Sequence, residues 1–311
     1  EYSNVGFTML GYIIEKVTGK NYGAYIKENI WKPLNMEASW EFSSIDDIKE
    51  KKDVILIATK VNSLFSLAEA IDPILKDDSV IVSLQNGMCE EYLSERFGEK
   101  RVLGCAVGWG ATVHEPGKLE KTSEGEFVLG TINNKGCYHF DFLKTILSHA
   151  AIIKCTDNIY GTLYSKLIIN SCITTLGAIC GLTLGQMLRK YKYRKIFIDT
   201  ICEAVKVGRA KGIIIEKYAG KIDFSEFADH NSIVANLKKH LIIFMVGLKY
   251  RKLKSSSLQS LQTGRATEID FLNGYIVKKA HECHVNTPVN NRLIGLVKEI
   301  EKGIRTISPE N

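Results

Sequence analysis

The run DVILIAT at residues 53–59 decides the fold class. A continuous apolar run of this kind is typical of a strand that is covered on both faces. The run SVIVSL at 79–84 repeats the pattern, and a helix is predicted between the two, over about 63–75. A third strand is predicted over 101–107, and short glycine-rich strands follow over 108–130. The β-α-β order predicts a parallel sheet with right-handed crossovers.

The second half of the chain has a different pattern. From about residue 158 it is predicted to be helical to its end, with long amphipathic or apolar stretches over 158–182, 193–213, 231–250, 265–283 and 289–303. The polar segment SSIDDIKEKK at 43–52 is a predicted junction. We therefore expect an α/β fold in three parts, which are a helical fragment over 1–42, a sheet domain over 46–155 and an all-α domain over 156–311.

Composition excludes several classes of function. The 311 residues are 45% apolar and 24% charged, and the formal net charge is +6, which suits anionic small molecules but is too weak to indicate nucleic acid. The eight cysteines form no C-x-x-C pair, which favours a reducing compartment without disulfides. The run His281-Glu282-Cys283-His284 lacks zinc-ligand spacing, so we predict no metal.

One stretch is long enough to cross a membrane. Residues 167–188 carry no charge, but they include polar side chains and three glycines, and a buried helix is the favoured interpretation. The chain opens on Glu-Tyr-Ser-Asn and shows no signal peptide. We expect a cytoplasmic protein with no membrane partner.

Two polar segments follow the predicted strands directly. Ala58-Thr59-Lys60 ends the first strand, and Leu84-Gln85-Asn86-Gly87 ends the second. In open α/β sheets, ligands bind beyond the carboxyl ends of the strands, where a cation and an amide can hold a phosphate or a nicotinamide-ribose. The alternative interpretation is structural, because Asn-Gly by itself is most often only a turn.

A lysine and an asparagine share one face of the helix predicted over 158–182. Lys166 and Asn170 are four residues apart, and an apolar setting would desolvate the lysine, lower its pKa and make it a usable general acid. By spacing alone, a lysine that extends to solvent from a helix end is the more common case. Further along, Thr267 is a candidate cap for a helix with Glu268 and Asp270 in its first turn, or Glu268 faces a cleft.

These segments together resemble the ketopantoate reductase family (2-dehydropantoate 2-reductases). The resemblance covers about residues 45–305 and rests on DVILIATK, VSLQNGM, GATVHEPGKL, EFVLG, SKLIINSCITTLGAICG, SSSLQSLQTGRATEIDFLNGYIV and NTPVNNRL. It implies a Rossmann-like domain followed by a helical domain similar to the C-terminal domain of 6-phosphogluconate dehydrogenase. The implied reaction is hydride transfer from NADPH to the ketone of ketopantoate, which gives pantoate for pantothenate and coenzyme A synthesis.

The resemblance also implies a role for each matching residue. Lys166 would be the general acid that protonates the developing alkoxide. The other implied contacts fall into two groups, with Asn170, Thr174, Ser256 and Glu268 at the substrate and Lys60 and Asn86 at the cofactor. The family often carries a second asparagine where this chain has Thr174, so a related 2-keto acid is an open alternative to ketopantoate. The helix over 193–213 is compatible with a homodimer.

The start of the chain departs from the family. No G-x-G-x-x-G occurs in the 311 residues, although the family begins with a strand and such a loop around the pyrophosphate. Residues 1–42 resemble instead an internal piece of the serine β-lactamase and penicillin-binding-protein-like hydrolases, with Tyr2-Ser3-Asn4 as their Y-x-N motif. The hydrolase motif S-x-x-K is absent, so we do not expect hydrolase activity.

Two hypotheses therefore stand at this level. The resemblance favours an NADPH-dependent 2-keto acid reductase. The absent glycine loop favours a catalytically incompetent fusion or misassembled fragment, in which the sheet domain is disturbed and the helical domain is near normal. The two differ in whether the chain binds NADPH.

Overall fold

The computed structural model describes residues 19, 45, 48, 50–115, 118–229 and 232–311. The predictions for residues 1–42, which include the helical fragment and its Tyr2-Ser3-Asn4 motif, lie outside these ranges. The chain divides into two compact units. The sheet unit runs as far as Gln85 and resumes over Cys89–Ile159, and the helical unit comprises Asn86–Met88 and Tyr160–Asn311.

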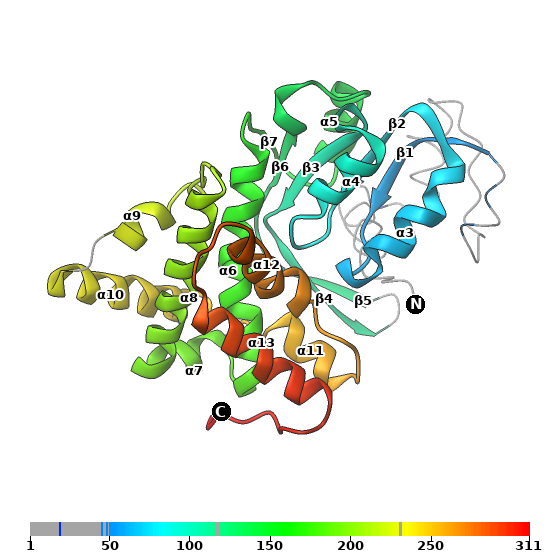
Figure 1. The fold of residues 1–311 in the computed structure, drawn as a ribbon. Helices are drawn as coiled ribbons and strands as arrows, with labels where there is room; N and C mark the ends of the chain where they lie inside the picture. The colour runs from blue at the N-terminus through cyan, green and yellow to red at the C-terminus, as the bar shows by residue number, and fades with distance from the viewer. Residues whose placement is uncertain (1–18, 20–44, 46–47, 49, 116–117, 230–231) are drawn as a thin grey trace. The chain divides into compact units, whose positions relative to one another are not determined.

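A five-stranded mixed sheet forms the centre of the sheet unit (Figure 1). Its strands, in spatial order, are β1 (Lys52–Ile57), β2 (Leu75–Ser83), β3 (Val102–Val107), β6 (Phe127–Thr131) and β7 (Ile153–Cys155). The pairs β1–β2, β2–β3 and β6–β7 are parallel, and β3–β6 is antiparallel. A separate two-stranded hairpin consists of β4 (Gly110–Glu115) and β5 (Lys118–Ser123). The Rossmann-like α/β class expected from the sequence is thus present.

The sheet agrees with the prediction in its parallel strands and differs from it in the burial of β1. The three strands for which parallel pairing was predicted, β1, β2 and β3, do pair in parallel. The chain then returns through the β4–β5 hairpin, without a crossover helix, so that β6 runs antiparallel to β3 and the sheet is mixed. The apolar run of β1 is less covered than predicted, because Ile57 alone among its residues is buried. Within the described residues β1 pairs on one side only, with β2, which accounts for its partial exposure.

Helices cover the sheet and close its core. They are α3 (Leu64–Ile71), α4 (Cys89–Phe97) and α5 (Phe140–Ser148), with short 3-10 turns η3 (Val61–Ser63), η4 (Asp72–Ile74), η5 (Glu99–Arg101) and η6 (Ile132–Asn134). The apolar residues Leu143 and Leu147 of α5 pack on Val80, Leu103 and Leu129 from three neighbouring strands. Burial of these side chains, at roughly 1.5–3 kcal/mol each, fixes the strands in one register.

The helical unit is built around one long helix, α6 (Ile159–Cys180). The remaining elements are α7 (Leu184–Arg189), α8 (Tyr191–Ala210), α9 (Phe224–Asp229), α10 (Ile233–Lys249), α11 (Ser256–Gln262), η7 (Ile269–Phe271), α12 (Asn273–Glu282) and α13 (Pro288–Glu301). In Figure 1, α6 runs through the middle of this unit, with α8 on one side and α12 and α13 on the other. All five predicted helical stretches contain helix at these positions.

Helix α6 is the one helix of the described residues that is long and apolar enough to cross a membrane. In its most apolar window 83% of the residues are buried inside the unit, as expected for a core helix. Gly177 shows how closely it is packed, because a Cβ built there would lie 2.4 Å from the Cβ of Ser255. The helix therefore serves as a rigid support for any side chain that it presents.

Candidate functional site

The polar segments after β1 and β2 are joined by hydrogen bonds inside the sheet unit. The two strands end side by side, with Ile57 opposite Ser83. The amide of Gln85, which is 4% exposed, donates to the carbonyl of Lys60 at 3.2 Å and to the hydroxyl of Thr59 at 3.3 Å. Ser63 also donates to the Lys60 carbonyl, at 2.9 Å. The backbone that carries the Lys60 ammonium is thus held at the carboxyl end of the sheet.

The turn Asn86-Gly87 belongs to the helical unit. Gly87 has a φ of +101°, which side chains with a Cβ rarely adopt, and a Cβ there would lie 3.1 Å from the carbonyl oxygen of Phe271. Glycine is therefore required at this position for the turn to lie against the segment that follows Glu268. The turn is thus packed against η7, and a functional role for this Asn-Gly stays a prediction.

Helix α6 carries Lys166 and Asn170, which the spacing placed on one face, and Thr174 one turn further on. Lys166 and Asn170 are half-buried, and Thr174 is 7% exposed. The hydroxyl of Thr174 donates to the backbone carbonyl of Asn170 at 2.8 Å. Because this intrahelical bond uses its proton, Thr174 offers a ligand mainly its oxygen lone pairs and its methyl group.

A chain of side-chain hydrogen bonds joins three of the predicted residues. The amide of Asn170 donates to the side-chain oxygen of Asn86 at 3.3 Å, and the amide of Asn86 donates to Oε2 of Glu268 at 3.4 Å. These contacts connect residues that are 84 and 182 positions apart in the sequence. Together with Lys166, one turn before Asn170 on α6, they offer an ammonium, two amides and a buried carboxylate.

Glu268 is held in place by the residue that precedes it. Thr267 does not cap a regular helix, because only the 3-10 turn η7 follows, but its hydroxyl accepts from the backbone N–H of Ile269 at 3.3 Å. Its backbone N–H and its hydroxyl both donate to Oε1 of Glu301, at 2.8 and 2.7 Å. Glu301 at the end of α13 thereby anchors the segment that carries Glu268, a contact that the sequence pattern did not indicate.

This anchor predicts a pH dependence of stability. Burial alone would raise the pKa of the Glu301 carboxyl, but the Thr267 hydrogen bonds and the charge of Lys298 lower this pKa overall from 4.5. A lowered folded-state pKa contributes stability that is present above about pH 4.5 and is lost as the pH falls through the folded value. In urea unfolding, we expect Glu301→Gln to cost about 1–2 kcal/mol at pH 7 and less at pH 4. Glu310→Gln, in the exposed tail, is the matched control, and an equal loss at both pH values would contradict the assignment.

Ser256, predicted at the substrate, has Ser255 as its neighbour at the start of α11. It is exposed at the first position of α11, whereas Ser255 is 3% exposed and caps that helix. The Ser255 hydroxyl accepts from the N–H of Leu258 at 3.0 Å and donates to the carbonyl of Thr174 at 2.7 Å. Ser255 therefore fixes α11 against α6. A serine just before a predicted helix is a common cap, and this was the signal for Ser255 that the sequence offered.

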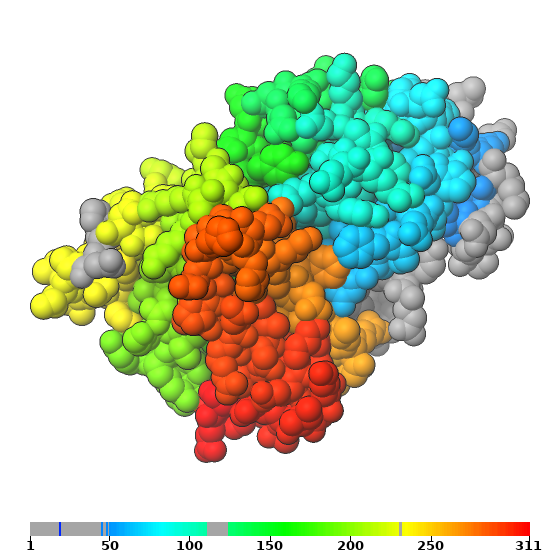
Figure 2. Space-filling model, in the orientation of Figure 1, coloured from blue at the N-terminus to red at the C-terminus, as the bar shows by residue number. Residues whose placement is uncertain are grey.

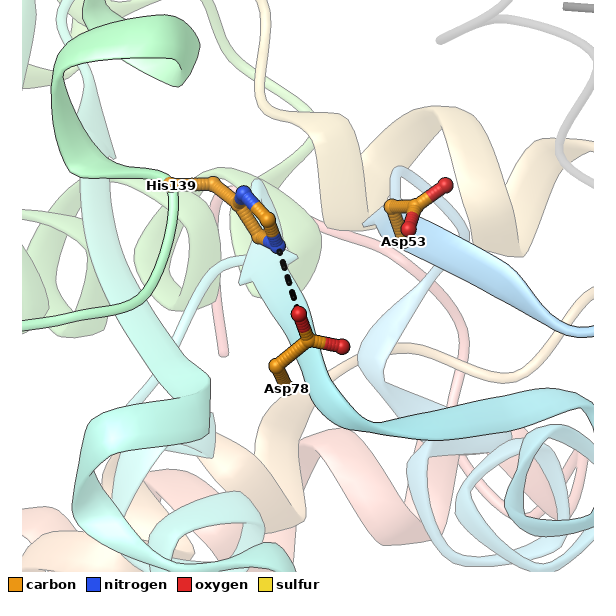
Figure 3. Close-up of side chains that lie close together, drawn as sticks. All are labelled: Asp53, Asp78 and His139. Carbon is orange, nitrogen blue, oxygen red and sulfur yellow. Dashed lines mark ion pairs between the residues drawn. The ribbon is translucent and has the colours of Figure 1, made fainter.

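Two other features of the described residues lie apart from these contacts. Asp53, Asp78 and His139 come within 4.8 Å of one another in the sheet unit, and Figure 3 shows the ion pair between His139 and Asp78 at 3.7 Å. Both carboxylates are exposed, and Lys76 already pairs with Asp53 at 2.7 Å, so a surface ion-pair cluster accounts for the arrangement. A cavity of about 400 Å³ lies between α7 and the end of α10, and none of the predicted site residues lines it.

The architecture is that of a two-domain dinucleotide-dependent oxidoreductase, with a Rossmann-like sheet unit followed by a helical unit. The chain belongs to the ketopantoate reductase family. The family model described as ketopantoate reductase PanE/ApbA matches residues 15–134, and the model of its C terminal matches residues 158–301.

Individual relatives support the same family. A 2-dehydropantoate 2-reductase of Pyrococcus horikoshii is 29% identical over 253 residues, which cover 81% of this chain and 76% of the relative. The corresponding protein of Archaeoglobus fulgidus is 24% identical over 82% of this chain and 79% of its own. Among solved structures, a PanE/ApbA family ketopantoate reductase from Ralstonia eutropha has a TM-score of 0.67 at 26% identity, covering 82% of this chain and 77% of that one.

The family match also bears on the N-terminal segment. It begins at residue 15, about thirty residues before the start predicted from the sequence motifs. The likeness of residues 1–42 to serine β-lactamases has no support among these relatives and stays a prediction.

A structure of D-mandelate dehydrogenase with NADH and anilino(oxo)acetate shares the fold, with a TM-score of 0.68 at 20% identity over 84% of this chain and 80% of that one.

Proposed function

We propose that the chain is a cytoplasmic, NADPH-dependent 2-dehydropantoate 2-reductase that forms pantoate for coenzyme A biosynthesis. The observation that supports this most is the contact chain Asn170–Asn86–Glu268 beside the Lys166 face of α6, in a member of the ketopantoate reductase family. Each of these residues has the chemistry that the reaction requires. Neither the fusion hypothesis nor the hydrolase hypothesis gains any comparable support.

The described part of the sheet unit fits a dinucleotide site. Parallel strands β1 and β2 end side by side, and dinucleotides bind at such strand ends. Gln85 holds the backbone of Lys60 there, and the ammonium of Lys60 would contact a cofactor phosphate. Asn86 follows immediately and would meet the nicotinamide end. When bound, NADPH supplies a hydride to the ketone carbon of the substrate.

The chain's own residues supply the proton and orient the substrate. As the ketone oxygen gains negative charge, Lys166 donates a proton from Nζ to it, so that the C=O bond becomes CH–OH. An ammonium in this place interacts most strongly with the transition state, where the charge develops, and this is the condition for a rate effect. Asn170 and Glu268 hold the substrate by hydrogen bonds, the carboxylate of Glu268 accepting from a substrate hydroxyl.

The identity of the 2-keto acid depends on Thr174. Its methyl group and its intrahelical hydrogen bond make it a poorer hydrogen-bond donor than an asparagine. The D-mandelate dehydrogenase neighbour is similar only in fold, yet it suggests that an aromatic 2-keto acid should be assayed in parallel. We propose ketopantoate as the preferred substrate because the relatives from Archaeoglobus fulgidus and Pyrococcus horikoshii are named 2-dehydropantoate 2-reductases.

The experiment that tests the proposal is a titration of the purified chain with NADPH, followed by cofactor fluorescence. Saturable binding, and then loss of NADPH absorbance on addition of ketopantoate, are the expected results. NADH and phenylglyoxylate serve as comparison cofactor and substrate. Absence of binding at about millimolar NADPH, which corresponds to less than roughly 4 kcal/mol of binding free energy, would instead establish the incompetent-fragment hypothesis.

We further propose that the chain self-associates through α10. This helix turns Lys239, 4% exposed, inward over the ring of Phe227, and its outward face is apolar. The exposed side chains of that face include Ile233, Val234, Leu237, Leu241 and Met245, at 55–89% exposure. Figure 2 shows the α9–α10 region, in yellow, at the margin of the helical unit. An exposed apolar stripe of this kind is typical of an interface, and one fold neighbour is a dimeric ketopantoate reductase from Staphylococcus aureus.

A charge placed in this face should separate the subunits. We expect Leu237→Glu combined with Leu241→Glu to convert a dimer to a monomer in light scattering coupled to gel filtration, with the helical circular dichroism unchanged. Both positions are solvent-exposed in the single chain, so the folded subunit tolerates the charges. Asn236→Glu, on the same helix but off the apolar face, is the control and should stay dimeric. A monomeric unmodified chain would contradict this prediction.

A further inference from the structure

A buried polar cluster lies behind the candidate site and has no place in the mechanism above. It consists of Ser171 and Thr175 on α6, Asn273 at the start of α12, Asn290 on α13 and Glu203 on α8. All five are buried, with exposures of 0–7%. Buried polar groups are costly unless they are hydrogen-bonded, so a cluster of this size in a helical core calls for a function.

Asn273 uses both N–H donors of its amide, and its side-chain oxygen accepts a hydrogen bond as well. Its Nδ2 donates to the backbone carbonyl of Ser171 at 3.2 Å and to Oδ1 of Asn290 at 2.9 Å. Its Oδ1 accepts from the hydroxyl of Thr175 at 2.6 Å. A single side chain thus binds α6 at two points and α13 at a third.

Glu203 determines which way the two amides face. Its Oε1 accepts from the N–H of Val289 at 2.9 Å, and its Oε2 accepts from the N–H of Asn290 at 2.9 Å and from Nδ2 of Asn290 at 2.7 Å. A carboxylate can only accept, so Asn290 must turn its Nδ2 toward Glu203 and its Oδ1 toward Asn273. Asn273 must then present its own Nδ2 to that oxygen. The first turn of α13 also stabilises the carboxylate through the helix dipole.

The cluster joins the two segments that carry the candidate chemistry. Ser171 directly follows Asn170 on α6, and Asn273 lies five residues after Glu268, beyond the single turn of η7. Asn86 links Asn170 to Glu268 directly, and Asn273 links the same two segments through the core. A shift of α6 against η7 would strain the Asn273 contacts as well as those of Asn86.

We propose that Asn273, oriented by Asn290 and Glu203, is a positioning residue that fixes α6 against the Glu268 segment, so that Lys166 and Glu268 converge on one substrate. This proposal rests on the reductase function proposed above. It differs from a purely structural role, in which the cluster would contribute stability without setting the geometry of the site.

The test uses Asn273→Asp in the full chain. The two side chains have nearly the same shape, but aspartate loses both donors and turns an oxygen toward the carbonyl of Ser171 and toward Oδ1 of Asn290. Because residue 273 is the first of α12, the helix dipole favours a carboxylate there and supports folding of the variant. We expect kcat for ketopantoate to fall by about tenfold or more, since misplacing reacting groups by ~1 Å can cost about a hundredfold. The dissociation constant of NADPH should stay within about twofold.

Two control variants separate positioning from stability. Leu293→Ala removes a buried apolar side chain of α13 outside the cluster, and its melting temperature should fall at least as far as that of Asn273→Asp. Assayed well below both melting temperatures, Leu293→Ala should keep the kcat of the unmodified chain. Asn291→Asp places the same chemical change on the exposed neighbour of Asn290 and should leave kcat and the melting temperature unchanged.

Hydrogen exchange gives a readout that does not depend on activity. In Asn273→Asp, amides of α6 around residues 166–175 and those of 268–272 should exchange faster, while those of α10 keep their rates. The proposal is overturned if Asn273→Asp retains full kcat, or if Leu293→Ala loses as much activity at equal destabilisation. An unmodified chain that binds no NADPH and reduces no 2-keto acid would refute the reductase function, and the exchange pattern would then still decide whether Asn273 couples α6 to the Glu268 segment.

Discussion

Lys166→Ala should lower the kcat for ketopantoate reduction by about 10²–10⁴-fold, the range typical of a lost general acid. Lys166 is half-buried on α6, one turn before Asn170, whose amide is in contact with Asn86 and, through it, with Glu268. Without its ammonium, no group of comparable acidity on this helix face can protonate the developing alkoxide. The measurement is steady-state kinetics with NADPH and ketopantoate. Substrate binding should change less than kcat, because the proton is needed only as charge develops.

One further variant distinguishes the loss of the proton donor from the loss of the positive charge, and a second serves as the control. Lys166→Arg keeps the positive charge, but the guanidinium does not release its proton in the accessible pH range, so it should restore little of the rate. Lys206→Ala removes an exposed lysine of α8 and should retain full kcat with an unchanged melting temperature. If Lys166→Ala turned over at the rate of the unmodified chain, Lys166 would not be the acid.

The fold class was accessible from the sequence because apolar patterning controls it. The continuous runs at 53–59 and 79–84 became β1 and β2, and the uncharged stretch after residue 158 became the core helix α6. The sequence carries a turn signal between β4 and β5, the pair Pro116-Gly117. The direction of β6 was still not accessible, because a turn signal does not show where the chain rejoins the sheet after the hairpin. Helix α10 was predicted, but the exposure of its apolar face was not. An apolar stripe on a helix is normally assigned to the core.

The candidate site was accessible only as separate residues. Spacing placed Lys166 and Asn170 on one face, since they lie on one helix, and the Asn-Gly turn followed a strand. The contacts that join them are long-range, such as Asn86 with Glu268, and no local pattern encodes these. Asn273 and Glu301 were missed for the same reason, because a buried asparagine and a helix-end glutamate look like ordinary helix residues until their partners are known.

The second large effect is expected for Glu268→Gln, which should lower kcat/KM for ketopantoate by about 10²-fold, or about 2–3 kcal/mol, as for the loss of a charged hydrogen-bond acceptor. Glu268 is 6% exposed, and its Oε2 accepts from the amide of Asn86. Glutamine has the same shape but no charge, and its own amide nitrogen must turn either toward the nitrogen of Asn86 or toward the substrate hydroxyl. In the first case the contact chain breaks, and in the second the substrate loses its acceptor. Both outcomes weaken the complex with substrate, so KM should rise along with any fall in kcat.

The matched control lies two residues further on. Asp270 is exposed and pairs with Lys298 at 2.5 Å on the surface, so Asp270→Asn should change kcat/KM by less than about threefold. The dissociation constant of NADPH should change less than kcat/KM in Glu268→Gln, because Lys60 keeps its proposed cofactor contact and Asn86 keeps its hydrogen bond from Asn170. A parallel loss of NADPH affinity in Glu268→Gln would move Glu268 from the substrate to the cofactor. An unchanged kcat/KM would remove it from the site and leave its contact with Asn86 a purely structural one.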